Sequence, residues 1–444
     1  MHNLALALHD IGHKISGSDD KVFDPSRSRL EAKGLLPAKE GWFPEKLETD
    51  IDAVILGMHA KADNPELKKA QDLGLKIFSY PEFLYELSKD KTRVVIGGSH
   101  GKTTITAMIL HVLNYYKRDF DYMVGAQLDG FDNMVKISDA SLIILEGDEY
   151  LASPLDPRPK FHLYKPQIAL ISGIAWDHIN VFPSREEYLK QFEIFVSLID
   201  DVGTLVYNNT DEEVRKVALA ESKRLFLMSY GYSDYEIKGE NSIVAFNGIK
   251  YELNIFGKHN LLNMEGARKV CRRLGVNNRA FFNAIKAFEG ASRRLEILRE
   301  TDKGIVYRDF AHAPSKLEAT VEAVKKQFEI PLVAVFELHT YSSLNPEFLP
   351  EYRNTMDEAD KAIVFFDKET LKHKNLPPLS KEQVELHFGR KKDIEVFTNR
   401  DELMKYLEAI DYPKYNLLMM SSGTFNGLKL NEVAEKLFPE NSGE

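Results

Sequence analysis

A glycine-rich stretch at residues 97–104 carries the residue types that bind nucleotide phosphates. It lies between a short apolar run at 94–96, typical of a strand, and an apolar pattern at 105–113 with helical spacing. Backbone N–H groups and a helix N-terminus therefore converge where a polyphosphate would bind. The residues expected to hold the nucleotide are Gly98, Ser99, His100, Gly101, Lys102, Thr103 and Thr104.

Two side chains of this loop can act on the phosphates directly. Lys102 would place a positive charge on the β- and γ-phosphates, and the Thr103 hydroxyl would occupy one position on Mg²⁺. The loop is a shorter variant of the strict G-x-x-x-x-G-K-[ST] pattern, because Ile96 stands where that pattern needs its first glycine. A glycine-rich turn with a chance Lys-Thr pair is the weaker interpretation, since strand, turn and helix follow in the order that the mechanism requires.

Acidic residues follow a second apolar run, at 141–145, which is typical of a short strand. Glu146, Asp148 and Glu149 would stand at the carboxyl end of this strand, where α/β sheets keep their ligand sites. Carboxylate oxygens beside a phosphate loop suit Mg²⁺. The sequence therefore predicts a metal site at this strand end.

An Asp-His pair follows a third apolar run, at 168–174. As an isolated dipeptide, Asp177-His178 would be an ordinary surface pair. After a buried strand in a phosphate-binding domain, it becomes a candidate for a second metal site.

Three further polar sets stand at predicted helix starts or between segments. Asn260 and Asn263 occur three residues apart where a helix opens, and Asn260 either caps that helix or contacts a ligand. Arg294, in an Arg-Arg pair between two segments, is either solvated surface or reaches the γ-phosphate. Asp309 and His312 lie at a turn between a predicted strand and a helix that begins with a proline.

The elements that would position these residues alternate between strand and helix along the whole chain, which indicates an α/β fold. Its 444 residues are enough for roughly three domains. We predict an incomplete Rossmann-like N-terminal domain at 1–90, a central P-loop α/β domain at 91–290 and a C-terminal Rossmann-like α/β domain at 291–444. The central domain should contain a β-hairpin at 235–255 with an Asn-Gly turn.

The first predicted domain lacks its usual beginning. Leu4, Leu8 and Ile11 share one face of a helix, and residues 14–19 resemble a strand that ends in a polar turn. A strand and a glycine-rich turn should precede such a helix, and neither is in the sequence. Either the sequence starts too late or the strand is truly missing, and in both cases we expect the sheet edge to be exposed where a ligand phosphate would bind.

Composition excludes several classes of function. The chain has 58 basic and 68 acidic residues, and its net charge of −10 argues against nucleic acid or an anionic membrane as a partner. No apolar run approaches the length of a membrane span, and residues 1–10 lack the pattern of a signal peptide, so we expect no membrane insertion and a cytoplasmic location. The one cysteine, Cys271, is predicted to be a buried apolar residue.

Six of these motifs together resemble the Mur ligase family, the ATP-dependent ligases that build the peptide stem of bacterial peptidoglycan. They occur in the family's order at residues 98–104, 146–149, 177–178, 259–263, 293–296 and 309–314. The resemblance implies three domains, with ATP and Mg²⁺ as cofactors. In the implied reaction, a muramate carboxylate attacks the γ-phosphate of ATP to give an acyl phosphate, and an amine then displaces the phosphate.

The resemblance also implies a role for each residue. Lys102 would neutralise the phosphates, Thr103 and Glu146 would hold one Mg²⁺, and His178 would help to hold a second. Arg294 would join Lys102, Glu146 and His178 as a catalytic residue. Further contacts to the nucleotide are implied for Asn260, Asn263, Arg294, Asp309 and His312. Closure of the C-terminal domain would complete the site and exclude water.

The identity of the amine stays open between two subfamilies. The stretch at 16–19 resembles members that take UDP-N-acetylmuramate, and the implied substrate contacts are Ser16, Ser18, Asp19, Asp148, Glu149 and His339. The insertion at 150–166 and the stretch at 420–427 are similar to ligases that recycle the peptide L-alanyl-γ-D-glutamyl-meso-diaminopimelate. The His-x-Tyr at 339–341 is more like ligases that add L-alanine. We favour the peptide, with L-alanine as one alternative and a nucleotide-binding protein without ligase activity as another.

Overall fold

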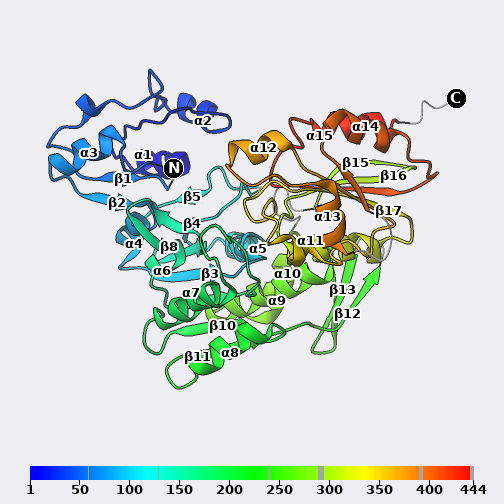
Figure 1. Ribbon diagram of the computed structural model, residues 1–444. Coiled ribbons are helices and arrows are strands. Elements are labelled where there is room, and N and C mark those ends of the chain that lie inside the picture. Colours follow the sequence, from blue (N-terminus) through cyan, green and yellow to red (C-terminus); the bar gives the residue numbers. More distant parts are fainter. Residues whose placement is uncertain (59, 129, 239–240, 289–294, 390–393, 441–444) are drawn as a thin grey trace. The chain divides into compact units, whose positions relative to one another are not determined.

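The computed structural model describes residues 1–58, 60–128, 130–238, 241–288, 295–389 and 394–440 (Figure 1). The chain forms two compact units. Unit 1 comprises Met1–Ile174, Leu189–Gly231 and Gly266–Ala284, and unit 2 comprises Ala175–Tyr188, Tyr232–Glu265 and Ile285–Glu444. The α/β prediction is confirmed, because both units contain parallel sheets connected by helices. No helix in the described ranges has the length and hydrophobicity needed to cross a membrane.

Unit 1 begins with a small α/β region (Figure 1). Its two short strands pair in parallel, as expected for consecutive strands joined by a helix. Its elements are α1 (His2–Asp10), α2 (Ser26–Ala32), η1 (Pro44–Lys46), β1 (Val54–Leu56), α3 (Pro65–Asp72), β2 (Ile77–Ser79) and α4 (Tyr80–Ser88). The start of α4 is fixed by a capping box, in which the Ser79 and Glu82 side chains satisfy each other's backbone N–H groups.

The prediction of a strand at 14–19 is wrong. These residues make only an isolated antiparallel bridge, between Asp19 and Gly41. The Ser18 hydroxyl instead donates a hydrogen bond to Glu66 Oε1 at 2.6 Å. The Ser18 side chain thus bonds to the start of α3, and the backbone of this stretch does not join the β1–β2 sheet.

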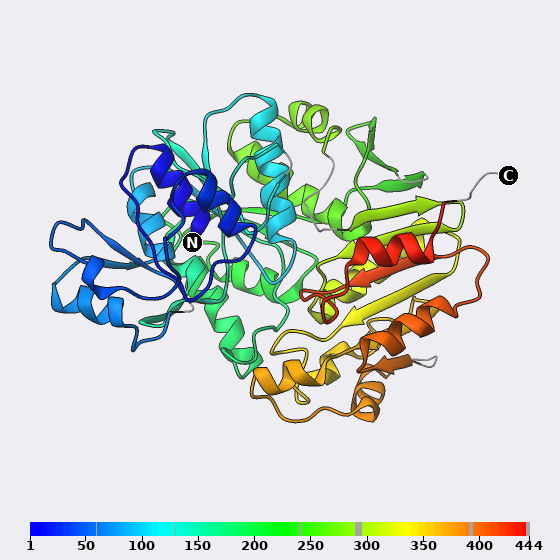
Figure 2. The same cartoon turned by 90° about the horizontal axis from the view of Figure 1, so that it is seen from above.

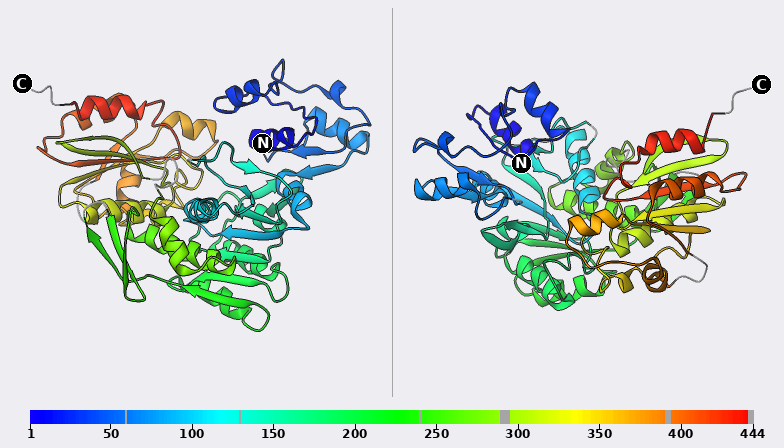
Figure 3. Two further views of the ribbon diagram at one scale, coloured as in Figure 1. Left: turned by 180° about the vertical axis from the view of Figure 1, so that it is seen from behind. Right: turned by 45° about the horizontal axis from the view of Figure 1, so that its top comes forward.

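The centre of unit 1 is a seven-stranded sheet, shown from behind in Figure 3, with helices on both sides. Its strand order is β11-β10-β9-β3-β6-β4-β5, and all neighbours are parallel except β4 and β5. The strands are β3 (Thr92–Gly97), β4 (Asp121–Met123), β5 (Val135–Lys136), β6 (Leu142–Glu146), β9 (Ile168–Ile171), β10 (Thr204–Asn208) and β11 (Phe226–Tyr230). Since β6, β3 and β9 are neighbours, their carboxyl ends meet at one edge, where ligand sites of such sheets lie.

The helices predicted at 105–113 and from Asn260 are present, as α5 (Lys102–Tyr115) and α9 (Lys258–Arg273). The other helices around this sheet are α6 (Lys160–Leu163), α7 (Arg185–Ser197), α8 (Glu212–Ala220) and α10 (Asn278–Ile285). A short hairpin, β7 (Leu151–Ser153) and β8 (Asp156–Pro159), precedes α6 within the insertion noted above. Cys271 of α9 is fully buried, as predicted, and burial raises the pKa of its thiol.

Unit 2 contains a three-stranded and a six-stranded sheet. The first consists of β12 (Tyr235–Lys238), β13 (Asn241–Phe246) and β14 (Ile249–Leu253), and β13 and β14 form the predicted hairpin with Asn247 and Gly248 at positive φ. The second has the order β15-β16-β20-β17-β18-β19. Its strands are β15 (Glu296–Thr301), β16 (Gly304–Asp309), β17 (Leu332–Glu337), β18 (Lys361–Phe365), β19 (Ile394–Phe397) and β20 (Asn416–Met420).

Two separate cores cover the faces of the six-stranded sheet, because alternate residues of a strand point to opposite sides. Phe336 of β17 packs with α11 (Pro314–Gln327) and α13 (Lys381–Phe388). The preceding residue of the strand, Val335, packs with α14 (Arg400–Glu408) and α15 (Leu430–Leu437) on the other face (Figures 1 and 2). The remaining helices are η2 (Leu349–Tyr352) and α12 (Lys368–His373). The buried parallel strands of this sheet, which lie between helix layers, explain the unbroken apolar runs in the sequence.

A buried arginine fixes the start of β3, the strand that leads into the phosphate loop. Arg93 is 4% exposed, and its guanidinium group donates to backbone carbonyls of Ser88, Lys89, Lys91, Tyr164 and Lys165 at 2.8–3.2 Å. These carbonyls belong to the end of α4, to the turn that follows it and to the chain after α6. One side chain therefore ties three segments of unit 1 together.

We expect Arg93→Met to lower the free energy of unfolding by about 2–4 kcal/mol, because several buried carbonyls would lose their donor. Urea denaturation followed by circular dichroism measures this change. Arg158→Met is the matched control, because the Arg158 side chain is 57% exposed, and its loss should cost under about 1 kcal/mol. Equal effects of the two substitutions would contradict the anchoring role of Arg93.

Candidate active site

The phosphate loop joins β3 to α5 and runs against the end of β9. Gly98 has φ +129°, and a Cβ added there would lie 2.1 Å from Ser172 Oγ. Gly101, with φ +75°, is the N-cap residue of α5. Only glycine suits the first position, because both the backbone conformation and the lack of space exclude a side chain.

The predicted phosphate ligand, Lys102, is the first residue of α5. Its Nζ donates to the carbonyl of Gly98 and to Glu149 Oε2, both at 2.6 Å. Burial alone would lower the pKa of the Lys102 ammonium group, but the neighbouring carboxylates, Glu149 first, raise it above its ordinary value. The lysine therefore stays charged beside the loop.

The two predicted ligands of the first Mg²⁺ are in contact. The Thr103 hydroxyl donates to Glu146 Oε1 at 2.8 Å, and the backbone N–H of Gly125 donates to Glu146 Oε2 at the same distance. A hydroxyl and a carboxylate in contact form a donor set of oxygen atoms, which is the type that Mg²⁺ prefers. These residues of unit 1 therefore fit a magnesium ion.

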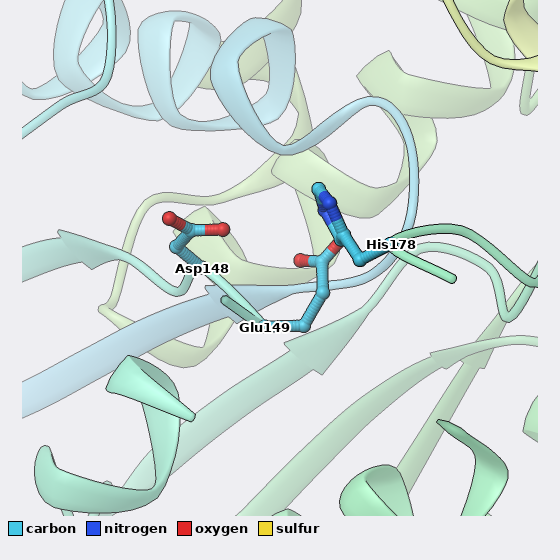
Figure 4. A group of neighbouring side chains, drawn as sticks. All are labelled: Asp148, Glu149 and His178. Carbon is cyan, nitrogen blue, oxygen red and sulfur yellow. The ribbon is translucent and has the colours of Figure 1, made fainter. Parts of the chain in front are cut away.

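The two acidic residues after Gly147 have different partners. Figure 4 shows the carboxylates of Asp148 and Glu149 pointing in different directions. Lys160 of α6 donates to Asp148 Oδ2 at 2.6 Å, while Glu149, 1% exposed, pairs with Lys102. Burial alone would raise the pKa of Asp148, but Lys160 holds it below its ordinary value. The insertion that contains α6 is thus linked by charge to the acidic strand end.

Two further residues of unit 1 shape the loop, and motif spacing did not reveal them. The Ser172 hydroxyl donates to the carbonyl of His100. A Cβ added at Gly173 would lie 2.3 Å from His100 Nε2, so the imidazole ring occupies the space that this glycine leaves. Gly173 follows β9 by two residues, and only the fold brings it beside the loop.

Unit 2 contains the Asp-His pair, which Figure 4 also labels through His178. Asp177 is 5% exposed, and its Oδ1 accepts hydrogen bonds from the His178 N–H and from the Ser342 hydroxyl, at 2.7 and 3.2 Å. Although burial raises the pKa of the Asp177 carboxyl, nearby positive charges, His178 first, hold it below its ordinary value. Asp177 is therefore not an ordinary surface residue but an anchor for the backbone of His178, which has φ +57°.

The predicted amide pair lies in the first two turns of α9. Asn263 Nδ2 donates to Asn260 Oδ1 at 3.2 Å, and Asn260 Nδ2 donates to the carbonyl of Phe256 at 2.9 Å. Asn260 stands inside the helix, so the interpretation of it as the helix cap is wrong. The two amides are oriented by each other within unit 2.

Asp309 ends β16 and His312 lies in the turn that follows, as predicted, and both contact backbone groups. Asp309 Oδ2 accepts from the N–H of Leu295 and Oδ1 from the N–H of Ala311, each at 2.7 Å. His312 Nδ1 lies 2.8 Å from the carbonyl of Phe310. The Asp309 carboxylate thus stabilises the turn that presents His312. Arg294, the remaining predicted nucleotide contact, lies outside the described residues.

The predicted substrate residues fall in both units. In unit 1, Ser16 and Asp19 are exposed, and Ser18 is half-buried against Glu66. In unit 2, His339 follows β17, close to the buried Glu337, with 3.8 Å between His339 Nδ1 and Glu337 Oε1. Burial lowers the pKa of the His339 imidazole.

A loop after β20 completes the site in unit 2, and Glu337 holds it in place. Glu337 Oε2 accepts from the hydroxyl of Ser421 and, at 2.8 Å, from the N–H of Phe425. The loop contains three consecutive residues at positive φ, 425–427. A charged residue at the end of an apolar strand was the sequence signal that could have revealed Glu337.

This loop lines a cavity of about 470 Å³ at the carboxyl ends of β16 and β20. Its wall includes charged groups of both signs, and Ser422 Oγ is buried with no hydrogen-bond partner among the described residues. The charged and hydroxyl residues of the lining are Arg308, Asp309, Ser421, Ser422, Thr424, Lys429 and Glu432. Such a cavity suits a polar, charged ligand of moderate size.

The fold and the phosphate loop define a nucleotide-binding α/β protein, and three family descriptions match it. They are "Mur ligase family, catalytic domain" over residues 1–92, "Mur ligase middle domain" over 96–271 and "Mur ligase, glutamate ligase domain" over 293–423. The chain belongs to the Mur ligase family, and as a member it is an ATP-dependent amide ligase that releases ADP. The resemblance inferred from the six motifs is confirmed, together with the three-domain α/β fold that it implied.

Curated relatives match over nearly the whole chain. A UDP-N-acetylmuramate–L-alanine ligase from Caldanaerobacter subterraneus subsp. tengcongensis is 31% identical, over 99% of this chain and 95% of its own length. The ligase of the same name from Carboxydothermus hydrogenoformans is 30% identical, over 97% and 93%.

Solved structures share the fold. A UDP-N-acetylmuramate–alanine ligase from Thermotoga maritima has a TM-score of 0.70 at 19% identity, covering 98% of this chain and 95% of its own. A murein peptide ligase from Psychrobacter arcticus has a TM-score of 0.66 at 22% identity, with the same coverage. Both subfamilies therefore adopt this architecture, and fold alone does not separate them.

We expect Gly173→Ala to raise the KM for ATP roughly tenfold, because the added methyl group would displace the His100 ring from the phosphate loop. The ring can move, so the free energy of unfolding should fall by only about 1 kcal/mol. Steady-state kinetics and urea denaturation measure the two quantities. Gly57→Ala, whose methyl group would meet Met1 Cγ at an ordinary 3.6 Å, is the control, and an equal KM for both variants would contradict this account of Gly173.

Proposed function

We propose that the chain joins the carboxyl group of UDP-N-acetylmuramate to the amino group of an L-alanyl-γ-D-glutamyl-diaminopimelate-type peptide. The contact between Thr103 and Glu146, beside the lysine of the phosphate loop, supports the nucleotide half of this proposal. The cavity of unit 2 supports the peptide half, because about 470 Å³ lies in the range of sites for drug-sized ligands and far exceeds what a single alanine fills.

The chemistry follows from the charges that must meet. A carboxylate attacks the γ-phosphorus, the bond from that phosphorus to the bridging oxygen breaks, and ADP leaves with the electron pair. Two anions approach each other in this step, so positive charge at the phosphates lowers the barrier. Lys102 supplies one such charge, and Mg²⁺, when bound by Thr103 and Glu146, would neutralise charge on the phosphate oxygens. The neutral amine then attacks the acyl carbon, the bond from that carbon to the phosphate oxygen breaks, and phosphate leaves with the electron pair while the nitrogen loses a proton to solvent.

The remaining residues act in the proposal as the family resemblance implies. His178 would contribute to a second metal site, and Arg294 would reach the phosphates. Asn260, Asn263, Asp309 and His312 would contact the nucleotide, while Ser16, Ser18, Asp19, Asp148, Glu149 and His339 would contact the two other substrates. The use of ATP with a nucleotide-linked sugar supports a cytoplasmic location.

L-alanine is the second candidate for the amine, and the comparisons favour it over the peptide. The curated relatives described above are all named L-alanine ligases. The His-x-Tyr sequence at 339–341 supports the same choice. In unit 2, His339 lies directly against the loop after β20, where either amine would meet it.

ADP release in the presence of ATP, Mg²⁺ and UDP-N-acetylmuramate decides between the two amines. We expect kcat/KM for L-alanyl-γ-D-glutamyl-meso-diaminopimelate to exceed that for L-alanine at least about a hundredfold, since a site built for a polar substrate strongly rejects an analogue that leaves its groups unpaired. The opposite preference would assign the chain to the L-alanine reaction. Absence of ADP release with both amines, while ATP still binds, would favour the nucleotide-binding protein without ligase activity.

We expect Gly423→Ala to raise the KM for the amine at least about tenfold and to leave the KM for ATP unchanged. The added Cβ would lie 2.5 Å from His339 Nδ1 and 2.8 Å from Glu337 Oε2, and the buried Glu337 cannot move away. The loop that lines the cavity would therefore shift. Steady-state kinetics with each substrate varied in turn measures the effect, and a parallel rise of both KM values would contradict a local role in amine binding.

A further inference from the structure

The lysine that should meet the nucleotide phosphates already has a carboxylate partner. Lys102 Nζ and Glu149 Oε2 are 2.6 Å apart, and the two side chains are only 13% and 1% exposed. A buried ion pair of this kind is little screened by solvent. A nucleotide phosphate can therefore bind Lys102 only by displacing Glu149 or by sharing the ammonium group with it.

The acidic strand end also carries more negative than positive charge. Glu146, Asp148 and Glu149 contribute three carboxylates, whereas Lys102 and Lys160 contribute two ammonium groups. The hydrogen bonds to Glu146 come from a hydroxyl and a backbone N–H, which carry no formal charge. A metal-free triphosphate would bring several more negative charges to this edge, and like charges close together are strongly unfavourable.

We propose that Glu149 is a positioning residue that makes the loop select the magnesium complex of the nucleotide over the free nucleotide. By holding Lys102, Glu149 withholds the charge that would otherwise attract a bare triphosphate. A metal ion that arrives with the nucleotide supplies the missing positive charge, and the phosphate then competes successfully for Lys102. This inference rests on the proposed nucleotide site and adds a determinant of which form of ATP is bound.

Asp148 offers a matched comparison for this role. Asp148 directly precedes Glu149 in the sequence, but its side chain is 38% exposed and its partner is Lys160. Removing its charge changes the net charge of the strand end as much as removing that of Glu149. It leaves the Lys102–Glu149 pair intact, however, so it separates the specific pairing from a general charge effect.

Binding of a non-hydrolysable ATP analogue, measured by isothermal titration calorimetry with EDTA or with Mg²⁺, tests the proposal. We expect Glu149→Gln to tighten metal-free binding at least about tenfold, since close charge pairs at binding sites couple by more than the 1.4 kcal/mol that a factor of ten requires. Asp148→Asn should tighten metal-free binding by less than about threefold. In both variants, the affinity for the magnesium complex should change little. This change should be much smaller than the gain in metal-free affinity expected for Glu149→Gln.

Two results would overturn the inference: no gain in metal-free affinity for Glu149→Gln, or an equal gain for Asp148→Asn. Should Glu149→Gln fail to fold, Glu149→Asp keeps the charge but draws it back by one methylene, and it should give a smaller gain in metal-free affinity. A wild-type chain that binds neither form of the analogue would instead count against the proposed nucleotide site itself. A purely structural role for Glu149 would weaken both forms equally and would not change their ratio.

Discussion

The arrangement of unit 1 depends on a concentration of carboxylates at one end of a parallel sheet. Glu146, Asp148 and Glu149 would repel one another if each were not held by a different partner: a hydroxyl and a backbone N–H, Lys160, and Lys102. The phosphate loop supplies Lys102 and the Thr103 hydroxyl, and the insertion that contains α6 supplies Lys160. The same contacts that stabilise the acidic strand end therefore also place the loop lysine and the threonine hydroxyl, so that stability and the placing of the reactive groups have one origin.

Unit 2 uses buried carboxylates in a different way. Asp177 accepts hydrogen bonds from the Ser342 hydroxyl and from the N–H of the next residue, His178. Glu337 accepts them from the Ser421 hydroxyl and the Phe425 N–H of the loop after β20. A buried carboxylate is costly unless such donors surround it, so each of these residues fixes the loop that satisfies it. Asp177 determines the backbone beside His178, and Glu337 determines the wall of the cavity. Neither residue needs to touch a substrate to control where one would lie.

The sequence predicted the positions of those candidate site residues that are adjacent to one another in the chain. The phosphate loop, the acidic strand end and the Asp309 turn were predicted because each lies at the end of an apolar run, where parallel sheets place their ligands. Prediction failed where the partner is distant: Lys160 beside Asp148, Gly173 beside His100 and Ser342 beside Asp177 depend on strand order, which one sequence does not reveal. The wrong strand at 14–19 has a related cause, since alternation of residues predicts a strand only if a neighbouring strand is available for pairing. The helix-cap interpretation of Asn260 failed because a helix boundary is uncertain by one or two residues from pattern alone.

The burial of the Cys271 thiol has a practical consequence for spectroscopy. Because the chain's only thiol is fully buried in α9 and resists ionisation, it is shielded from reagents that modify thiolates. A cysteine engineered on the surface of either unit would be the sole accessible target for a spin label or a fluorophore. One such label in each unit would then report interdomain distances during turnover without removal of the native residue.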